Sequence, residues 1–339
     1  MTRADVCAGI LWAGATAYAL FGGADFGGGF WDLVAGGAER GERPRALIQR
    51  SLTPVWEANH VWLIFILVVL WTAFPPAFSA VMTTLYVPIA LAAIGIVLRG
   101  SGFAFRKSIE GLSRRRAAGA TFAISSLLTP FFMGAVVGAI AAGNVPAGGD
   151  GAPFSSWLQP LPLLTGAMFV ASGAYLAAVF LIGDARRAGD EELERYFARR
   201  ALATAAVAGI AAAFGLVELH AESRYVFDRL THEGLPLVVI SALCGIGVLV
   251  ALLSSARRPA ASSSRLLRPL AAGAVVAVIW GWGVAQFPYL LPTSLKISEA
   301  AAPPDTLATV VVVFIAAAIL VLPALGLLYW LSQKELLGE

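Results

Sequence analysis

Long apolar stretches separated by short polar segments run through almost the whole chain. A helix needs about 20 mostly apolar residues to cross the hydrocarbon core of a bilayer. Stretches of about this length lie at 6–35, 52–74, 77–98, 118–142, 160–183, 200–219, 235–254, 268–287 and 306–331. This pattern predicts an all-α polytopic membrane protein with nine transmembrane helices, divided into groups of four, four and one.

The second and third stretches are separated only by Phe74, Pro75 and Pro76. Proline lacks the backbone N–H that continues a helix, yet it fits the first turn of the next one. We therefore expect these two spans to form a tight antiparallel pair.

The composition agrees with this class of protein. The chain is 58% hydrophobic and only 13% charged, with a mean hydropathy of +0.78, whereas soluble domains are about 25% charged. A net charge of +3 is too small and too scattered to suggest nucleic acid, so lipid is the expected surrounding. We expect one integral membrane domain over 1–339, with four-helix bundles at 1–143 and 153–288 and a peripheral helix at 305–332.

The basic residues alternate between the two sides of the predicted membrane. All but four of the 24 lysine and arginine residues fall in the first, third, fifth and seventh loops or in the C-terminal tail. The exceptions are Arg3, Arg224, Arg229 and Lys296. Cytoplasmic loops carry an excess of Lys and Arg. We therefore expect the N-terminus outside and the C-terminus in the cytoplasm.

Acidic residues stand inside the first apolar stretch. Asp25 lies within a run of glycines, and Asp32 follows seven residues later on the same helical face. Glycines let a neighbouring helix approach closely. In the predicted orientation Asp25 lies about two turns, roughly 12 Å, from the cytoplasmic end of its helix. We expect Asp32 to act as an interfacial cap or to pair with the basic cluster Arg40–Arg50.

The second stretch carries Glu57, Asn59 and His60 near its start. Ionisable groups inside a membrane are expensive and usually functional. Glu57 is about five residues in from the cytoplasmic side, and His60 should match Asp25 in depth. These groups predict a proton route with Glu57 as the point of uptake. The alternative is structural, because Asp25 or Glu57 could pair with Arg99 at the end of the third span.

The histidine count limits the redox chemistry of this chain. Only His60, His220 and His232 occur, and only His60 is clearly in a membrane segment. A bis-histidine haem needs two ligands, and copper sites need more. Cys7 and Cys244 lie in apolar stretches and are expected to be small buried side chains. We predict no metal site and no catalytic residue in this chain, with any redox centre on another subunit.

Four sequence blocks together resemble subunit II of the cytochrome bd quinol oxidase family. They are spaced along nearly the whole chain and read GGADFGGGFWDL, SLTPVWEANHVWLI, RGSGFAFRK and WGWGVAQFPYLLP. The resemblance implies two four-helix bundles with a peripheral ninth helix, in a heterodimer with subunit I. It implies that subunit I holds two b-type haems and one haem d, and that the complex oxidises membrane quinol and reduces oxygen to water. It further implies a bacterial cytoplasmic membrane, proton uptake from the cytoplasm through subunit II, and a structural quinone or a small accessory subunit in some members.

The resemblance also assigns site residues. Asp25 matches the second aspartate of the family's first-helix motif, whereas Gly22 stands where the first one is expected. Glu57 replaces an aspartate that many members carry, and His60 stands where Gln or Glu is common. The expected proton route is therefore Asp25, Glu57 and His60, with support from Asn59, Trp56, Arg99 and Asp32.

Two other readings stay open at this point. A stand-alone proton-coupled transporter would also explain buried acids and glycine-rich helices. A purely structural assembly partner would use the acids only to dock subunit I. The choice between ubiquinol and menaquinol is not encoded in these residues, because quinol oxidation is expected on subunit I.

Overall fold

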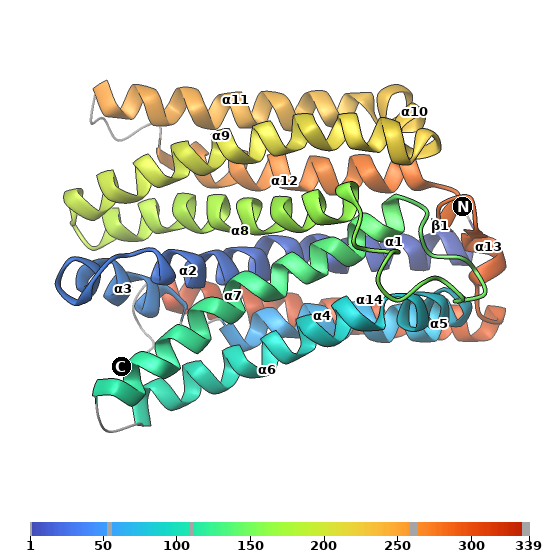
Figure 1. Cartoon of the computed structure of the whole chain (residues 1–339), viewed down its shortest axis with the longest axis horizontal. Helices are drawn as coiled ribbons and strands as arrows, with labels where there is room; N and C mark the ends of the chain where they lie inside the picture. The colour runs from blue at the N-terminus through green and yellow to red at the C-terminus, as the bar shows by residue number, and fades with distance from the viewer. Residues whose placement is uncertain (1, 53–55, 109–111, 258–263, 334–339) are drawn as a thin grey trace.

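The computed structural model describes residues 2–52, 56–108, 112–257 and 264–333 as a bundle of long, roughly parallel helices (Figure 1). Eight described helices or continuous helical runs are long and apolar enough to cross a membrane, and one bent pair brings the total to nine. The prediction of an all-α polytopic membrane protein is therefore confirmed. The spans are α1 (Arg3–Ala17) with η1 (Tyr18–Gly22) and α2 (Gly23–Leu33), α4 (Trp56–Ala73), α5 (Pro75–Thr84) with α6 (Tyr86–Ser108), α7 (Leu112–Ala141), α8 (Pro160–Arg187), α9 (Glu191–Glu222), α11 (Leu235–Arg257), α12 (Ser264–Gln286) and α14 (Pro304–Gln333).

Short elements connect the spans at the two ends of the molecule. At one end α3 (Ala38–Leu52) follows the first span; at the other end lie α10 (Arg224–His232), the strands β1 (Tyr289–Leu291) and β2 (Leu295–Lys296), and α13 (Ile297–Ala300). The two strands pair antiparallel.

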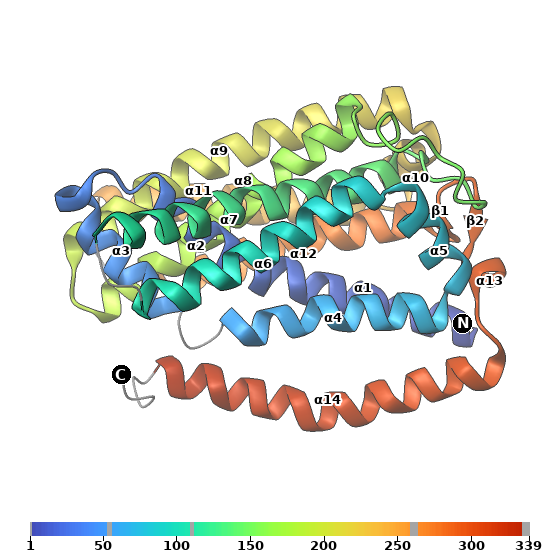
Figure 2. The ribbon, with the colours of Figure 1, turned by 60° about the horizontal axis from the view of Figure 1, so that its bottom comes forward.

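The third span is bent, and this corrects one prediction. An 86° bend separates α5 from α6, and helix α5 ends at Leu85 between them. After this bend α6 packs along α7, whereas α4 packs against α1 and α14 (Figure 2). The prediction that the second and third spans form a tight antiparallel pair is therefore wrong. The ten residues of α5 separate α4 from the bend at which α6 begins.

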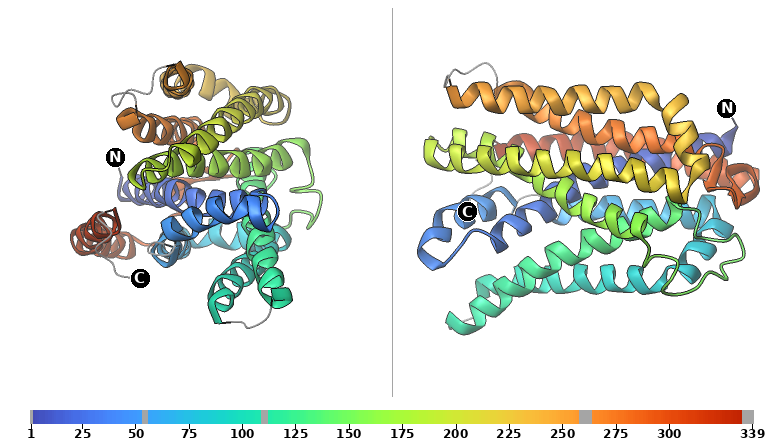
Figure 3. Two further views of the ribbon diagram at one scale, coloured as in Figure 1. Left: turned by 90° about the vertical axis from the view of Figure 1, so that its left-hand side faces the viewer. Right: turned by 45° about the horizontal axis from the view of Figure 1, so that its top comes forward.

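The remaining helices surround α8. Helices α8, α9, α11 and α12 pack on one another in sequence, and α8 also contacts α2 and α7. Helix α14 lies at the edge beside α1 and α4 (Figure 3, left). Its few contacts include the Cys7 thiol on the carbonyl of Leu307 and the ring of Phe65 beside Phe314.

Glycines of the first span allow α2 to approach α8 closely. A Cβ added to Gly27 would overlap the carbonyl group of Gly173 on α8. The same span contains a π-helical turn, Tyr18–Gly22, and a Cβ on Gly22 would come within 2.8 Å of the Tyr18 ring. Asp25 lies between Gly22 and Gly27 on this closely packed part of the first span.

The replacement Gly27→Ala tests this contact. Because the new methyl group meets backbone rather than a flexible side chain, helix α2 must move, and overpacking of this kind costs about 1–3 kcal/mol. Gly9→Ala on the same span is the matched control, since no atom lies within 4 Å of its Cβ position. Unfolding in mixed micelles measures both. Equal stability of the two variants would contradict the close approach of α2 and α8.

Candidate proton-transfer site

A fully buried ion pair lies between α2 and α6. The side chains of Asp25 and Arg99 are both about 1% exposed or less, and Arg99 Nη2 lies 2.7 Å from Asp25 Oδ1. The same nitrogen donates to the backbone carbonyl of Asp25 at 3.1 Å. Of the two roles considered for Asp25, the structure thus shows the pairing with Arg99 directly.

Three further side chains hold the guanidinium of Arg99. Nη1 donates to the hydroxyl of Ser126 on α7. The rings of Phe26 and Phe122 lie 4.8 and 4.5 Å from the guanidinium carbon. Gly29 makes room for this arrangement, because a Cβ there would overlap Ser126 and crowd Arg99. Cation–π contacts and a hydrogen bond therefore replace part of the solvation that the ion pair loses on burial, while Arg99 Nε is buried without a hydrogen-bond partner among the described residues.

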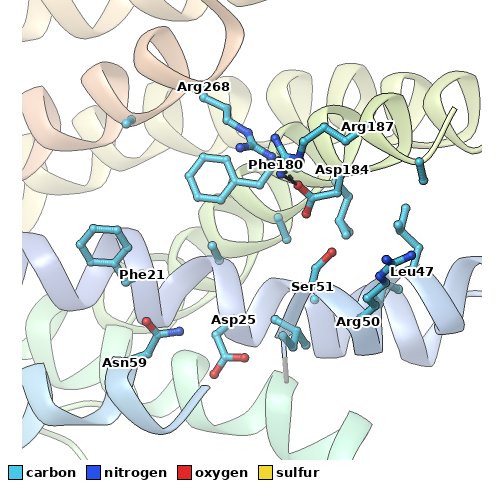
Figure 4. Close-up of a pocket in the computed structure, with 18 of the residues that line it drawn as sticks. Phe21, Asp25, Leu47, Arg50, Ser51, Asn59, Phe180, Asp184, Arg187 and Arg268 are labelled. Carbon is cyan, nitrogen blue, oxygen red and sulfur yellow. Dashed lines mark hydrogen bonds and ion pairs between the residues drawn. The ribbon is translucent and has the colours of Figure 1, made fainter. Parts of the chain in front are cut away.

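A cavity connects the ion pair with one end of the molecule. Its volume is about 490 Å³, within the range of small-molecule sites. Asp25 and Asn59 lie at its inner part, and charged residues of α3, α8 and α12 lie at its outer part (Figure 4). Asp25 Oδ2 is buried and has no hydrogen-bond partner among the described residues. One oxygen of this carboxylate is thus held by Arg99, whereas the other is buried without a partner among the described residues.

His60 and Trp56 lie beside this cavity without lining it. The His60 ring is partly buried and makes edge-to-face contacts with Phe26 and Trp56, at centroid distances of 6.0 and 6.3 Å. Its Nδ1 has no hydrogen-bond partner in the described part of the chain. The ring of Phe26 therefore lies between His60 and the guanidinium of Arg99.

Glu57 lies apart from the ion pair. It is exposed and occupies the outer face of α4. The same face carries exposed apolar side chains one and two turns apart along the helix: Val61, Ile64, Val68 and Trp71. The structure therefore brings Asp25, Asn59 and Arg99 together, and leaves Glu57 on a surface of this chain.

Asp32 is held by the basic cluster that follows it. Arg45 Nε lies 3.6 Å from Asp32 Oδ1 and donates to its backbone carbonyl at 3.3 Å. The other guanidinium nitrogens of Arg45 donate to the carbonyls of Gly36 and Gly37. Asp32 thus fixes the turn between α2 and α3, which is the pairing expected from the sequence.

The sequence did not indicate the charged group at the outer part of the cavity. Asp184 Oδ1 accepts from Arg268 Nη2 at 2.6 Å and also from Arg187. Arg268 donates as well to the carbonyl of Phe180 at 2.6 Å. In the sequence, Asp184 and Arg268 are only an acid and an arginine near the ends of two apolar stretches. The packing of α8 on α12 brings them together. Across the described residues, no three His, Cys, Asp or Glu side chains gather in a group that would hold a metal ion.

Replacing one member of the buried pair should lower the free energy of unfolding far more than replacing both. We expect Arg99→Leu to lose about 3–5 kcal/mol of unfolding free energy, because it leaves Asp25 charged and unpaired. The double variant Asp25→Asn/Arg99→Leu should recover much of this loss. Unfolding in mixed micelles measures the coupling, with Arg195→Gln as a control since its side chain is 73% exposed. Additive losses would show that the two residues do not act as a pair.

The comparisons with known proteins agree with one family. Residues 4–332 match the family described as cytochrome bd terminal oxidase subunit II. A stretch of 102 residues is 31% identical to the putative cytochrome bd menaquinol oxidase subunit II of Bacillus subtilis, covering 30% of this chain and 29% of that protein. Over 306 residues the chain is 26% identical to cytochrome bd-I ubiquinol oxidase subunit 2 of Escherichia coli, covering 82% of this chain and 78% of the relative.

A solved structure extends this agreement to the fold. The bd oxidase from Geobacillus thermodenitrificans contains a chain that superposes with a TM-score of 0.82 at 26% identity, over 98% of each chain. The family therefore matches nearly the full length of the chain, and the solved structure shares its helical architecture. This chain belongs to the cytochrome bd terminal oxidase subunit II family, and with that family to a quinol oxidase complex.

Proposed function

We propose that this chain is the non-haem subunit of a quinol oxidase that couples quinol oxidation to the reduction of O2 to water. In this role it stabilises subunit I and lines a route for the protons that oxygen reduction consumes. The observation that carries the proposal is the cavity that reaches Asp25 from the charged end of the helices. Membership of an oxidase family argues against a stand-alone transporter.

The haems of the complex belong to subunit I in this proposal. The described residues of this chain do not fit a haem that needs a pair of histidines. His60 lies near the start of α4 between Phe26 and Trp56, whereas His220 and His232 are exposed near the ends of α9 and α10, at the opposite end of the molecule (Figure 1). We therefore assign no catalytic residue and no metal ligand to this chain.

The outer faces of α4 and α6 are the proposed contact with subunit I. Both carry large exposed apolar side chains, among them Ile64 and Trp71 on α4 and Ile94 and Val97 on α6. Because α6 diverges from α4, these faces do not cover each other. Glu57 lies at the end of this apolar surface, so docking of subunit I would place its carboxyl group between the two subunits.

The proposed orientation follows from the charges. Helix α3, the end of α8 and the start of α9, which are rich in arginine, lie at one end of the molecule, and α10, α13 and the strand pair lie at the other. We assign the first end to the cytoplasm of a bacterial cell, because cytoplasmic loops are enriched in Lys and Arg. The cavity then opens toward the cytoplasm. The halves 1–143 and 153–288, with the peripheral helix 305–332, are proposed as the two bundles and the ninth helix.

This geometry changes the order of the proton route. The sequence suggested Glu57 as the point of uptake, but the cavity leads first to Asp25. We therefore place Asp25 at the inner end of the water-accessible part, with Asn59 and His60 next, and Glu57 as the group that passes protons to subunit I. After Asp25 has passed its proton on, Arg99 balances the charge of the carboxylate. The deprotonated form of Asp25 is therefore not an isolated buried anion.

The variant Glu57→Gln tests the transfer to subunit I. A glutamine keeps the size of the side chain but cannot exchange a proton, so quinol-dependent oxygen uptake should fall about 10²-fold. Haem content and co-purification with subunit I should stay normal. The matched control is Glu191→Gln, whose side chain is 88% exposed at the same end of the molecule. Unchanged turnover would remove Glu57 from the route, and loss of haem would indicate a structural role instead.

The double variant Asp25→Asn/Arg99→Leu tests whether the ion pair is needed for proton transfer or only for assembly. Since it removes both charges, the complex should assemble, but oxygen uptake should remain as low as in Asp25→Asn alone. Oxygen-electrode rates are compared at equal haem content. Full turnover in the assembled double variant would show that the pair serves only the fold.

A further inference from the structure

Arginines outnumber carboxylates among the described residues that line the outer part of the cavity. Arg50 of α3, Arg187 of α8 and Arg268 of α12 line it together with a single carboxylate, that of Asp184. Asp184 uses one oxygen, Oδ1, for both Arg187 and Arg268. The only other acid that lines the cavity, Asp25, is paired with Arg99 further in. The described lining residues at this part of the cavity therefore include three arginines and one carboxylate.

Arg187 and Arg268 are held by Asp184 before any ligand binds. Arg268 donates to Asp184 and to the carbonyl of Phe180, and its guanidinium lies 5.5 Å from the centre of the Phe180 ring. A Cβ on Gly183 would lie 2.7 Å from Arg268 Nη2, so glycine is needed for this position of the side chain. Arg50 approaches from α3, on the other side of the cavity from Arg187 and Arg268 (Figure 4).

The rest of the cavity wall is apolar. Phe21, Leu47, Leu52, Phe180 and Leu181 line it, together with small residues of α2, α8 and α12. A free inorganic anion would satisfy the arginines and leave this wall in contact with water. A quinone would cover the wall, but its neutral head group would not balance the positive charge.

We infer that this cavity binds one anionic phospholipid, with its phosphate between Arg50, Arg187 and Arg268 and part of an acyl chain against the apolar wall. Basic pockets between transmembrane helices on the cytoplasmic side suit such head groups. A phosphate accepts from more than one guanidinium at once. The lipid would then link α3 to α8 and α12 across the two halves of the chain. This inference concerns binding and does not require that Asp25 carries protons.

Lipid retention by the purified oxidase complex tests the inference. The complex is washed in mild detergent, and the phospholipid that remains is identified and counted per chain by mass spectrometry. We expect about one phosphatidylglycerol or other anionic phospholipid to survive the wash, as an interaction of about 1 kcal/mol per arginine implies. Arg50→Gln and Arg268→Gln should each weaken retention about fivefold. Arg195→Gln, exposed at the same end but outside the cavity, should retain lipid normally.

A second variant and two probes distinguish the occupants. Ala272→Phe extends a side chain from the cavity wall and leaves the arginines unchanged; it should also lose the lipid. After delipidation, vesicles of phosphatidylcholine with phosphatidylglycerol should restore thermal stability to the wild-type complex, whereas inorganic phosphate should not. Equal rescue by inorganic phosphate, equal rescue by pure phosphatidylcholine, or a retained quinone in place of the lipid would each overturn the proposal. Because retention and stability are measured without turnover, its failure is separate from failure of the proton route.

Discussion

The ion pair between Asp25 and Arg99 is the constraint on which the arrangement of the first helices depends. Two charges buried in a membrane protein cost several kcal/mol each unless they meet in good geometry with further hydrogen bonds. Here Arg99 in the second half of α6 reaches across to α2, with Ser126 of α7 as a third partner. The three helices are therefore fixed to one another at this end, and α6 stays with α7 instead of returning along α4.

This constraint has consequences on both sides of α4. On the inner side, Asn59 is buried beside the cavity that contains Asp25. On the outer side, Glu57 and the apolar side chains above it remain exposed, as a surface for another subunit requires. In the proposed function, the redox centres lie on subunit I, and this chain would contribute to oxygen reduction by supplying a charge-balanced path for protons.

Much of this could be predicted from the sequence, because hydrophobic stretches of membrane length and glycine runs act locally. Such local signals predict the spans, the all-α class and Asp25 as a candidate site residue. The pairing of Asp32 with a following arginine was also accessible, since Arg45 lies only 13 residues away. The bend after α5, the packing of α6 on α7 and the group formed by Asp184 and Arg268 were not accessible, because they depend on contacts between helices far apart in the chain. The position of Glu57 on the outer face could not be derived either, because it depends on which helices pack against α4.

The central claim is that Asp25 exchanges a proton with water in the cavity while its charge is balanced by Arg99. Infrared difference spectroscopy of the complete oxidase, recorded as electrons are delivered to the oxygen-reducing site, tests this claim most directly. The account predicts a carboxyl C=O band that changes during reduction, shifts in D2O and is missing in Asp25→Asn. A spectrum in which every carboxyl band is the same in wild type and in Asp25→Asn would contradict it.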